Sequence, residues 1–101
     1  MKIKKLCLAL AAACAFGAGS AHAATEIQWW HAHTGALSDR VNEIATKFNA
    51  SQSDYKLMAV YKGSYAETMT AAIAASRSGK APHIVQVFEV GTATMMAGKK
   101  A

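Results

Sequence analysis

Strand-like and helix-like segments alternate along the chain after its first 24 residues. Three short runs rich in β-branched and aromatic residues are typical of strands: 25–30, 55–61 and 83–88. The two segments between them carry apolar residues at the spacing of amphipathic helices: 37–48 and 64–77. Two successive strand–helix–strand units imply parallel pairing and right-handed crossovers. The sequence therefore predicts an α/β fold with parallel strands in the order β-α-β-α-β-α.

Local signals mark the predicted helices. The first shows the single apolar stripe of an amphipathic helix: Leu37, Val41, Ile44, Ala45 and Phe48. In the second, Ser64 and Glu67 fit a capping box, in which each side chain bonds the backbone N–H of the other residue. Gly79 suits the left-handed position after the helix, and Pro82 prevents its continuation.

The third predicted strand is apolar from Ile84 to Phe88, which favours burial on both faces, as in a parallel sheet. It ends at a carboxylate, Glu89. A third helix is expected to begin after the glycine at position 91, with Thr92 or Thr94 as its N-cap.

The first 23 residues are predicted to be a cleaved secretory signal peptide. "MKIKK" supplies three lysines, "LCLALAAACAF" is an apolar run, and an Ala-His-Ala site ends at Ala23. The apolar run is shorter than the about 20 residues that span a bilayer. A buried N-terminal helix and lipidation at Cys14 are the alternatives. Secretion is therefore expected.

Removal of this segment leaves residues 24–101, with eight basic and six acidic residues and a net charge of +2. The remaining cations are scattered, so nucleic-acid binding is not expected. Both cysteines, Cys7 and Cys14, lie in the predicted signal peptide. A disulfide framework and thiolate chemistry are therefore excluded from residues 24–101.

Polar residues follow each predicted strand, in the loops 31–35, 62–65 and 89–92. Open parallel sheets bind ligands at the carboxyl ends of their strands. Glu89 has two interpretations: a cap for nearby helix amides, or an acceptor for the hydroxyls of a polar ligand. Ser64 and Tyr65 open a helix, where an anion could bind, or they form only a capped turn.

Two further groups were considered as sites. His31 and His33 could bind a metal, but His83 lies at the opposite end of its strand and supplies no third ligand. The alternative is that they are ordinary loop histidines. Trp29 and Trp30 face opposite sides of the first strand, so one can be in the core while the other offers a stacking face. No nucleophile motif or phosphate-loop motif occurs.

Two segments resemble extracytoplasmic solute-binding proteins of sugar-type ABC transporters. They are "YKGSY", residues 61–65, and "QVFEVGTATMMA", residues 86–97, and the resemblance covers the chain after the predicted signal peptide. It implies two α/β lobes joined by a hinge, with residues 24–101 as the truncated N-terminal part of the first lobe. It also implies a non-catalytic, monomeric protein without a cofactor or metal, which delivers glycerol 3-phosphate or glycerophosphodiesters to permease and ATPase subunits.

The resemblance also assigns two ligand residues. Tyr65 matches a tyrosine that contacts the phosphate end of the ligand, and Glu89 matches a glutamate that accepts from the glycerol hydroxyls. The other residues of such a site would lie beyond residue 101. Three alternatives stay open: a binding protein for another sugar or phosphorylated polyol, a secreted metal-dependent hydrolase that uses His31 and His33, and a non-functional truncated product with an open sheet edge.

Overall fold

The computed structural model describes residues 23–98. Three parallel strands form one sheet in the order β2-β1-β3: β1 (Thr25–His31), β2 (Tyr55–Tyr61) and β3 (Ile84–Val85). β1 and β2 pair along their full length, from Thr25 opposite Tyr55 to His31 opposite Tyr61. β3 pairs with the other edge of β1. The predicted α/β class and the parallel pairing are confirmed.

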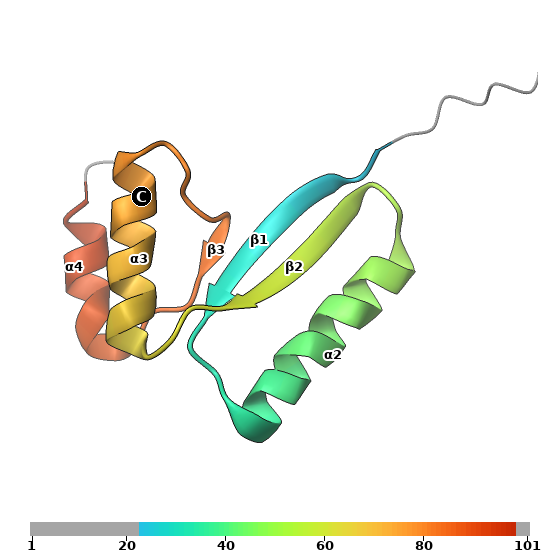
Figure 1. The fold of residues 1–101 in the computed structure, drawn as a ribbon, viewed down its shortest axis with the longest axis horizontal. Helices are drawn as coiled ribbons and strands as arrows, with labels where there is room; N and C mark the ends of the chain where they lie inside the picture. Colours follow the sequence, from blue (N-terminus) through green and yellow to red (C-terminus); the bar gives the residue numbers. More distant parts are fainter. Residues whose placement is uncertain (1–22, 99–101) are drawn as a thin grey trace, which may run out of the picture.

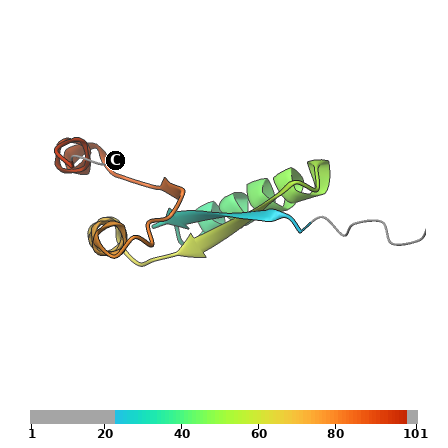
Figure 2. The same ribbon diagram turned by 90° about the horizontal axis from the view of Figure 1, so that it is seen from above.

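The strands alternate with helices: α2 (Gly35–Ser51), α3 (Tyr65–Arg77), the short 3₁₀ helix η1 (Glu89–Gly91) and α4 (Thr92–Met96). α2 runs beside β2, whereas α3 and α4 lie at the end of the sheet toward which β1 and β2 point (Figure 1). The view from above shows the same separation of α3 and α4 from α2 (Figure 2). The order β-α-β-α-β-α is therefore as predicted, with η1 inserted before the last helix.

Side chains at the end of α2 cover the outer edge of β2. The Asn49 amide donates to the Leu57 carbonyl at 3.0 Å and accepts from the Leu57 N–H at 2.7 Å. Gln52 makes the same pair of bonds with the backbone of Tyr55, each at 2.7 Å. These bonds occupy backbone groups that a free edge strand would otherwise present to another chain.

The ends of α3 follow their local sequence signals. The Ser64 hydroxyl accepts from the Glu67 N–H at 3.2 Å, as the capping box predicts. The Glu67 carboxylate accepts from the Ser64 hydroxyl instead of from its N–H, so the return bond differs from the prediction. Gly79 has a φ of 73°, and the bonds from Gly79 N to Ser76 O and from Lys80 N to Ala75 O complete a Schellman end.

Only part of the predicted apolar stripe of α2 is buried. Val41 and Ala45 are 5% and 7% exposed, whereas Leu37 and Ile44 are more than half exposed. Phe48 is also exposed. The predicted helix is confirmed, and within residues 23–98 only the centre of its apolar stripe is buried.

The third strand is shorter and more exposed than predicted. The ladder has only two pairs, Trp29 with Ile84 and Trp30 with Val85, and Ile84 is 46% exposed. The strand cannot continue to Phe88 on this edge because its partner β1 ends at His31, where the chain turns toward α2. Ile84 is exposed and residues 85–88 are only half-buried, so the predicted burial on both faces is wrong within residues 23–98.

The predicted N-cap of the last helix is also wrong. Gly91 occupies the N-cap position of α4, without a side-chain hydrogen bond, and Thr92 is already helical. The preceding turn η1 supplies the first helical geometry, so no threonine cap is needed.

The predicted signal peptide lies outside the described residues except for Ala23. In the described part of the chain, no helix is both long enough and apolar enough to cross a membrane.

Candidate ligand-binding edge of the sheet

The carboxyl ends of the three strands meet at one edge of the molecule. Lys62 N–H, just after β2, donates to the carbonyl of His31 at the end of β1 at 2.9 Å. Gln86 N–H, just after β3, donates to the Trp30 carbonyl at 2.9 Å. These backbone bonds bring together the three loops that the sequence pointed to.

Tyr65 is the first residue of α3 and stands at this edge with 41% of its surface exposed. Its ring lies 5.5 Å from the ring of Phe88, measured between centroids. Its hydroxyl oxygen accepts a hydrogen bond from the Gln86 side chain at 3.3 Å. The tyrosine is therefore held on one side and open to solvent on the other.

Glu89 is the first residue of η1 and is exposed. Its backbone carbonyl accepts from the N–H of Thr92. Within residues 23–98, no hydrogen bond joins its carboxylate to the amides of residues 91–94, so the cap interpretation finds no support there. An exposed carboxylate without such a bond is available as an acceptor.

Gly91 allows η1 to lie close to α3. A side chain at this buried glycine would lie 3.1 Å from each of three neighbours: Met69, Val87 and Phe88. The absence of a Cβ lets the turn approach Met69 of α3 closely. Because Phe88 contacts Tyr65 and directly precedes Glu89, the two predicted ligand residues belong to the same corner of the molecule.

Sequence reasoning missed the role of Gln86 at this corner. Its Oε1 accepts from the Ala32 N–H at 3.0 Å, and its Nε2 lies 2.9 Å from His33 Nε2 and 3.3 Å from the Tyr65 hydroxyl. One amide therefore joins the loop after β1 to the start of α3. The only available signal was a polar residue inside an apolar run.

His31 serves the packing of the sheet end. It is the last residue of β1, not a loop residue, and is 2% exposed. Its ring contacts the rings of Trp29, His33 and Tyr61. Burial, followed by the neighbouring His33, lowers the pKa of the His31 imidazole below its ordinary value of 6.5. Its Nδ1 accepts from the His33 N–H at 3.2 Å.

These contacts do not support the metal interpretation. His31 Nδ1 and His33 Nε2 already have hydrogen-bond partners. His83 Nδ1 accepts from Gln28 N–H at the other end of the sheet. The described residues hold no group of three His, Cys, Asp or Glu that could hold a metal ion.

Trp30 belongs to the core, and Trp29 is half-buried. The indole N–H of Trp30 donates to the Gln28 side chain at 2.9 Å, and the Lys62 ammonium lies 4.0 Å from the centroid of the Trp30 ring. A stacking face for a ligand is therefore not available on Trp30, because the lysine covers it.

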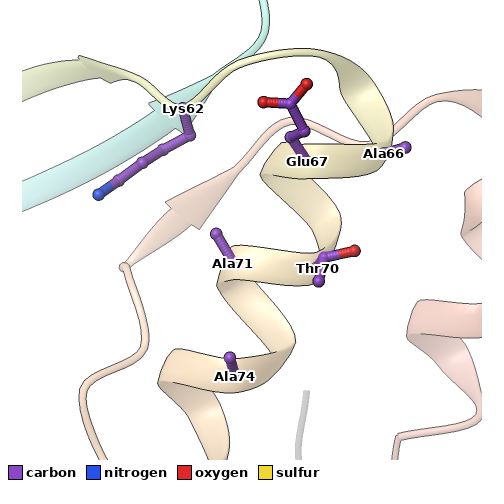
Figure 3. A pocket seen from close by; sticks show the side chains of 6 residues that line it. All are labelled: Lys62, Ala66, Glu67, Thr70, Ala71 and Ala74. Atoms are coloured by element: carbon purple, nitrogen blue, oxygen red, sulfur yellow. The ribbon is translucent and has the colours of Figure 1, made fainter.

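An open hollow of about 500 Å³ lies between Lys62 and one face of α3 (Figure 3). Small and polar side chains line it: Lys62, Ala66, Glu67, Thr70, Ala71 and Ala74. Tyr65 and Glu89 are not among them. The hollow is therefore distinct from the corner that carries the predicted ligand residues.

Comparison with known proteins shows which solved structure has a similar fold. No protein-family model matches the chain. A solved structure, the cyclic alpha-maltosyl-1,6-maltose binding protein from Arthrobacter globiformis, superposes with a TM-score of 0.57 and 27% identity, over 61% of this chain and 16% of that one. The chain therefore shares its α/β fold with a segment of a solute-binding protein, in agreement with the predicted fold class.

Relatives with similar sequences share a single name. Proteins named sn-glycerol-3-phosphate-binding periplasmic protein are 55% identical in Yersinia enterocolitica over 96% of this chain and 52% identical in Agrobacterium fabrum over 95%. The same named protein of Brucella suis is 52% identical over 92%. The chain is homologous to this family of periplasmic glycerol 3-phosphate-binding proteins. It spans 22% of the length of the Yersinia relative.

Proposed function

We propose that the chain forms part of a periplasmic solute-binding protein that captures sn-glycerol 3-phosphate for an ABC importer and catalyses no reaction. The observation that carries the proposal is the corner at the carboxyl end of the sheet, where the exposed donor Tyr65 contacts the ring of Phe88 and the exposed acceptor Glu89 directly follows Phe88 in the chain. The identity of 52–55% to named glycerol 3-phosphate-binding proteins supports glycerol 3-phosphate as the ligand of this corner.

The two side chains fit the two ends of that ligand. A phosphate carries acceptor oxygens, which a tyrosine hydroxyl can serve as a donor. A glycerol moiety carries hydroxyls, which an ionised carboxylate can accept from. Hydrogen bonds with a charged partner are shorter and stronger than neutral ones. Tyr65 would therefore contact the phosphate and Glu89 the glycerol body.

The remaining part of such a site would come from outside this chain. The relatives are more than four times longer than the segment that this chain matches. In proteins of this kind two domains close around the ligand by a hinge movement. The permease and ATPase subunits of an importer are the proposed partners of the closed, ligand-loaded protein.

The test is a titration of a chimera in which this chain replaces the matched segment of the Yersinia enterocolitica relative. Isothermal titration calorimetry with glycerol 3-phosphate should show one site with a micromolar or lower Kd. The unmodified relative is the control for folding and ligand quality. A folded chimera that binds no glycerol 3-phosphate would contradict the proposal.

A second candidate ligand is a sugar, because the solved neighbour is a binding protein for a cyclic maltose derivative. The same chimera decides between the two classes. Heat of binding from maltose or a cyclic maltosyl sugar, with no heat from glycerol 3-phosphate, would favour the sugar. The 52–55% identities favour glycerol 3-phosphate.

A further inference from the structure

Gln86 has no assigned role, yet its side chain joins the loop after β1 to Tyr65. We infer that Gln86 is a positioning residue for ligand binding: it holds the Tyr65 hydroxyl as an acceptor, so that the single hydroxyl proton is left for the ligand. This inference rests on the proposed function, since it requires that Tyr65 contacts the phosphate.

The orientation of the Gln86 amide is fixed by its neighbours. A backbone N–H can only donate, so the group that faces Ala32 N at 3.0 Å must be the Gln86 carbonyl oxygen. The amide nitrogen therefore faces the opposite way, toward Tyr65 and His33. The surrounding hydrogen bonds thus allow only one of the two possible amide orientations.

The amide nitrogen can only donate, which settles the direction of its two other bonds. One N–H serves His33 Nε2 at 2.9 Å, and the other serves the Tyr65 oxygen at 3.3 Å. Tyr65 then accepts from Gln86 and keeps its own proton. With 41% of the tyrosine exposed, that proton is free to point toward a ligand oxygen.

The backbone of Gln86 is hydrogen-bonded to the central strand β1. Its backbone N–H donates to the Trp30 carbonyl at 2.9 Å, which places the residue directly beyond the last pair of the β1–β3 ladder. Binding residues keep their geometry best when side chains with fixed orientations support them on regular elements. Gln86 transmits the position of the sheet edge to the first residue of α3.

A double-mutant cycle in the chimera tests this role. Gln86→Met keeps a side chain of similar length and removes the amide. With Tyr65 unchanged, we expect Gln86→Met to weaken glycerol 3-phosphate binding about three- to tenfold, the scale of one hydrogen bond. In the Tyr65→Phe background the same change should weaken binding less than about twofold, because no hydroxyl remains to orient.

Gln86→Glu is the second variant, for use if Gln86→Met does not fold. It keeps an acceptor for Ala32 N–H but cannot donate, and it would take the Tyr65 proton for itself. Its added charge repels an anionic ligand in both backgrounds, so only the difference between backgrounds reports on Tyr65. Gln28→Met is the matched control, since the Gln28 amide also bridges two side chains, Trp30 and Glu26, but does not contact Tyr65.

The outcomes separate the two claims. The positioning role is supported if the Gln86 variants lose affinity for glycerol 3-phosphate only when the Tyr65 hydroxyl is present. The affinity of Gln28→Met should then stay within about twofold of that of the unmutated chimera. Equal losses in both Tyr65 backgrounds, or no loss in either, overturn it while the proposed function stands. An unmutated chimera that folds and does not bind glycerol 3-phosphate overturns the proposed function and this inference with it.

Discussion

At the scale of single residues, His31 shows why a metal-like pattern misleads. The two histidines of "HAH" are spaced as ligands in an extended chain, but the strand buries the first ring among aromatic neighbours. Its Nδ1 is then used to hold the turn at His33. The sequence could not show this, because burial depends on which residues the neighbouring strand places beside the ring.

Burial of His31 predicts a dependence of stability on pH. Its folded pKa lies below the ordinary 6.5, so below that pH the unfolded chain binds more protons than the folded one. The contribution of His31 to the free energy of unfolding is therefore complete above about pH 6.5 and is lost as the pH falls toward the folded pKa.

Urea unfolding of the chain between about pH 5 and 8 measures this dependence. His31→Asn offers an oxygen to the His33 N–H and has no titrating ring, so it should flatten the loss at low pH. An equal loss in the parent chain and in this variant would assign the effect to other groups.

Glu89→Ala tests the acceptor assigned to the glycerol hydroxyls. In the chimera it should weaken glycerol 3-phosphate binding by about 1.5–3 kcal/mol, the scale of a hydrogen bond to a charged group. Glu26→Ala is the matched control, because Glu26 is an exposed carboxylate near the start of β1, at the end of the strand away from the site. An unchanged affinity in Glu89→Ala would remove Glu89 from the binding site.

At the scale of elements, predictions succeeded where the signal is local. The first two strands, the helices at 35–51 and 65–77 and the end at Gly79 follow from residue types within a few positions of each boundary. The third strand failed because pairing needs a partner, and β1 ends at His31. Its apolar residues, Ile84 to Phe88, could not reveal where that partner stops.

The start of α3 carries a prediction at this scale. Ser64 satisfies the N–H of Glu67, so Ser64→Ala should lower the free energy of unfolding by about 1 kcal/mol. Ser76→Ala is the control: Ser76 lies in the same helix and is exposed, it contributes to the helix end only through its backbone carbonyl, and alanine is the better helix former. Urea denaturation of the chain should show a loss for the first variant only. Equal effects of both variants would show that the cap contributes nothing.

At the scale of the whole molecule, the described part of the chain leaves apolar surface open. Leu37, Ile44 and Ile84 are each close to half exposed or more, on α2 and on the edge strand β3. The composition alone gave no indication of this, since it is that of a globular protein.

The candidate site was predictable only in part, because some of its contacts join residues that lie far apart in the sequence. Parallel strands predicted ligand residues at the carboxyl edge, and the resemblance of "YKGSY" and "QVFEVGTATMMA" implied Tyr65 and Glu89. Gln86 was beyond reach, because its role comes from contacts with Ala32, His33 and Tyr65, which lie more than 20 positions away in the chain.

We propose that this chain supplies one side of a glycerol 3-phosphate site. Calorimetric titration of the purified chain beside the chimera tests it most directly. We expect a micromolar or tighter Kd for the chimera, and weak or no binding for the chain, since Tyr65 and Glu89 alone cannot enclose the ligand. Micromolar or tighter binding by the chain alone would contradict it.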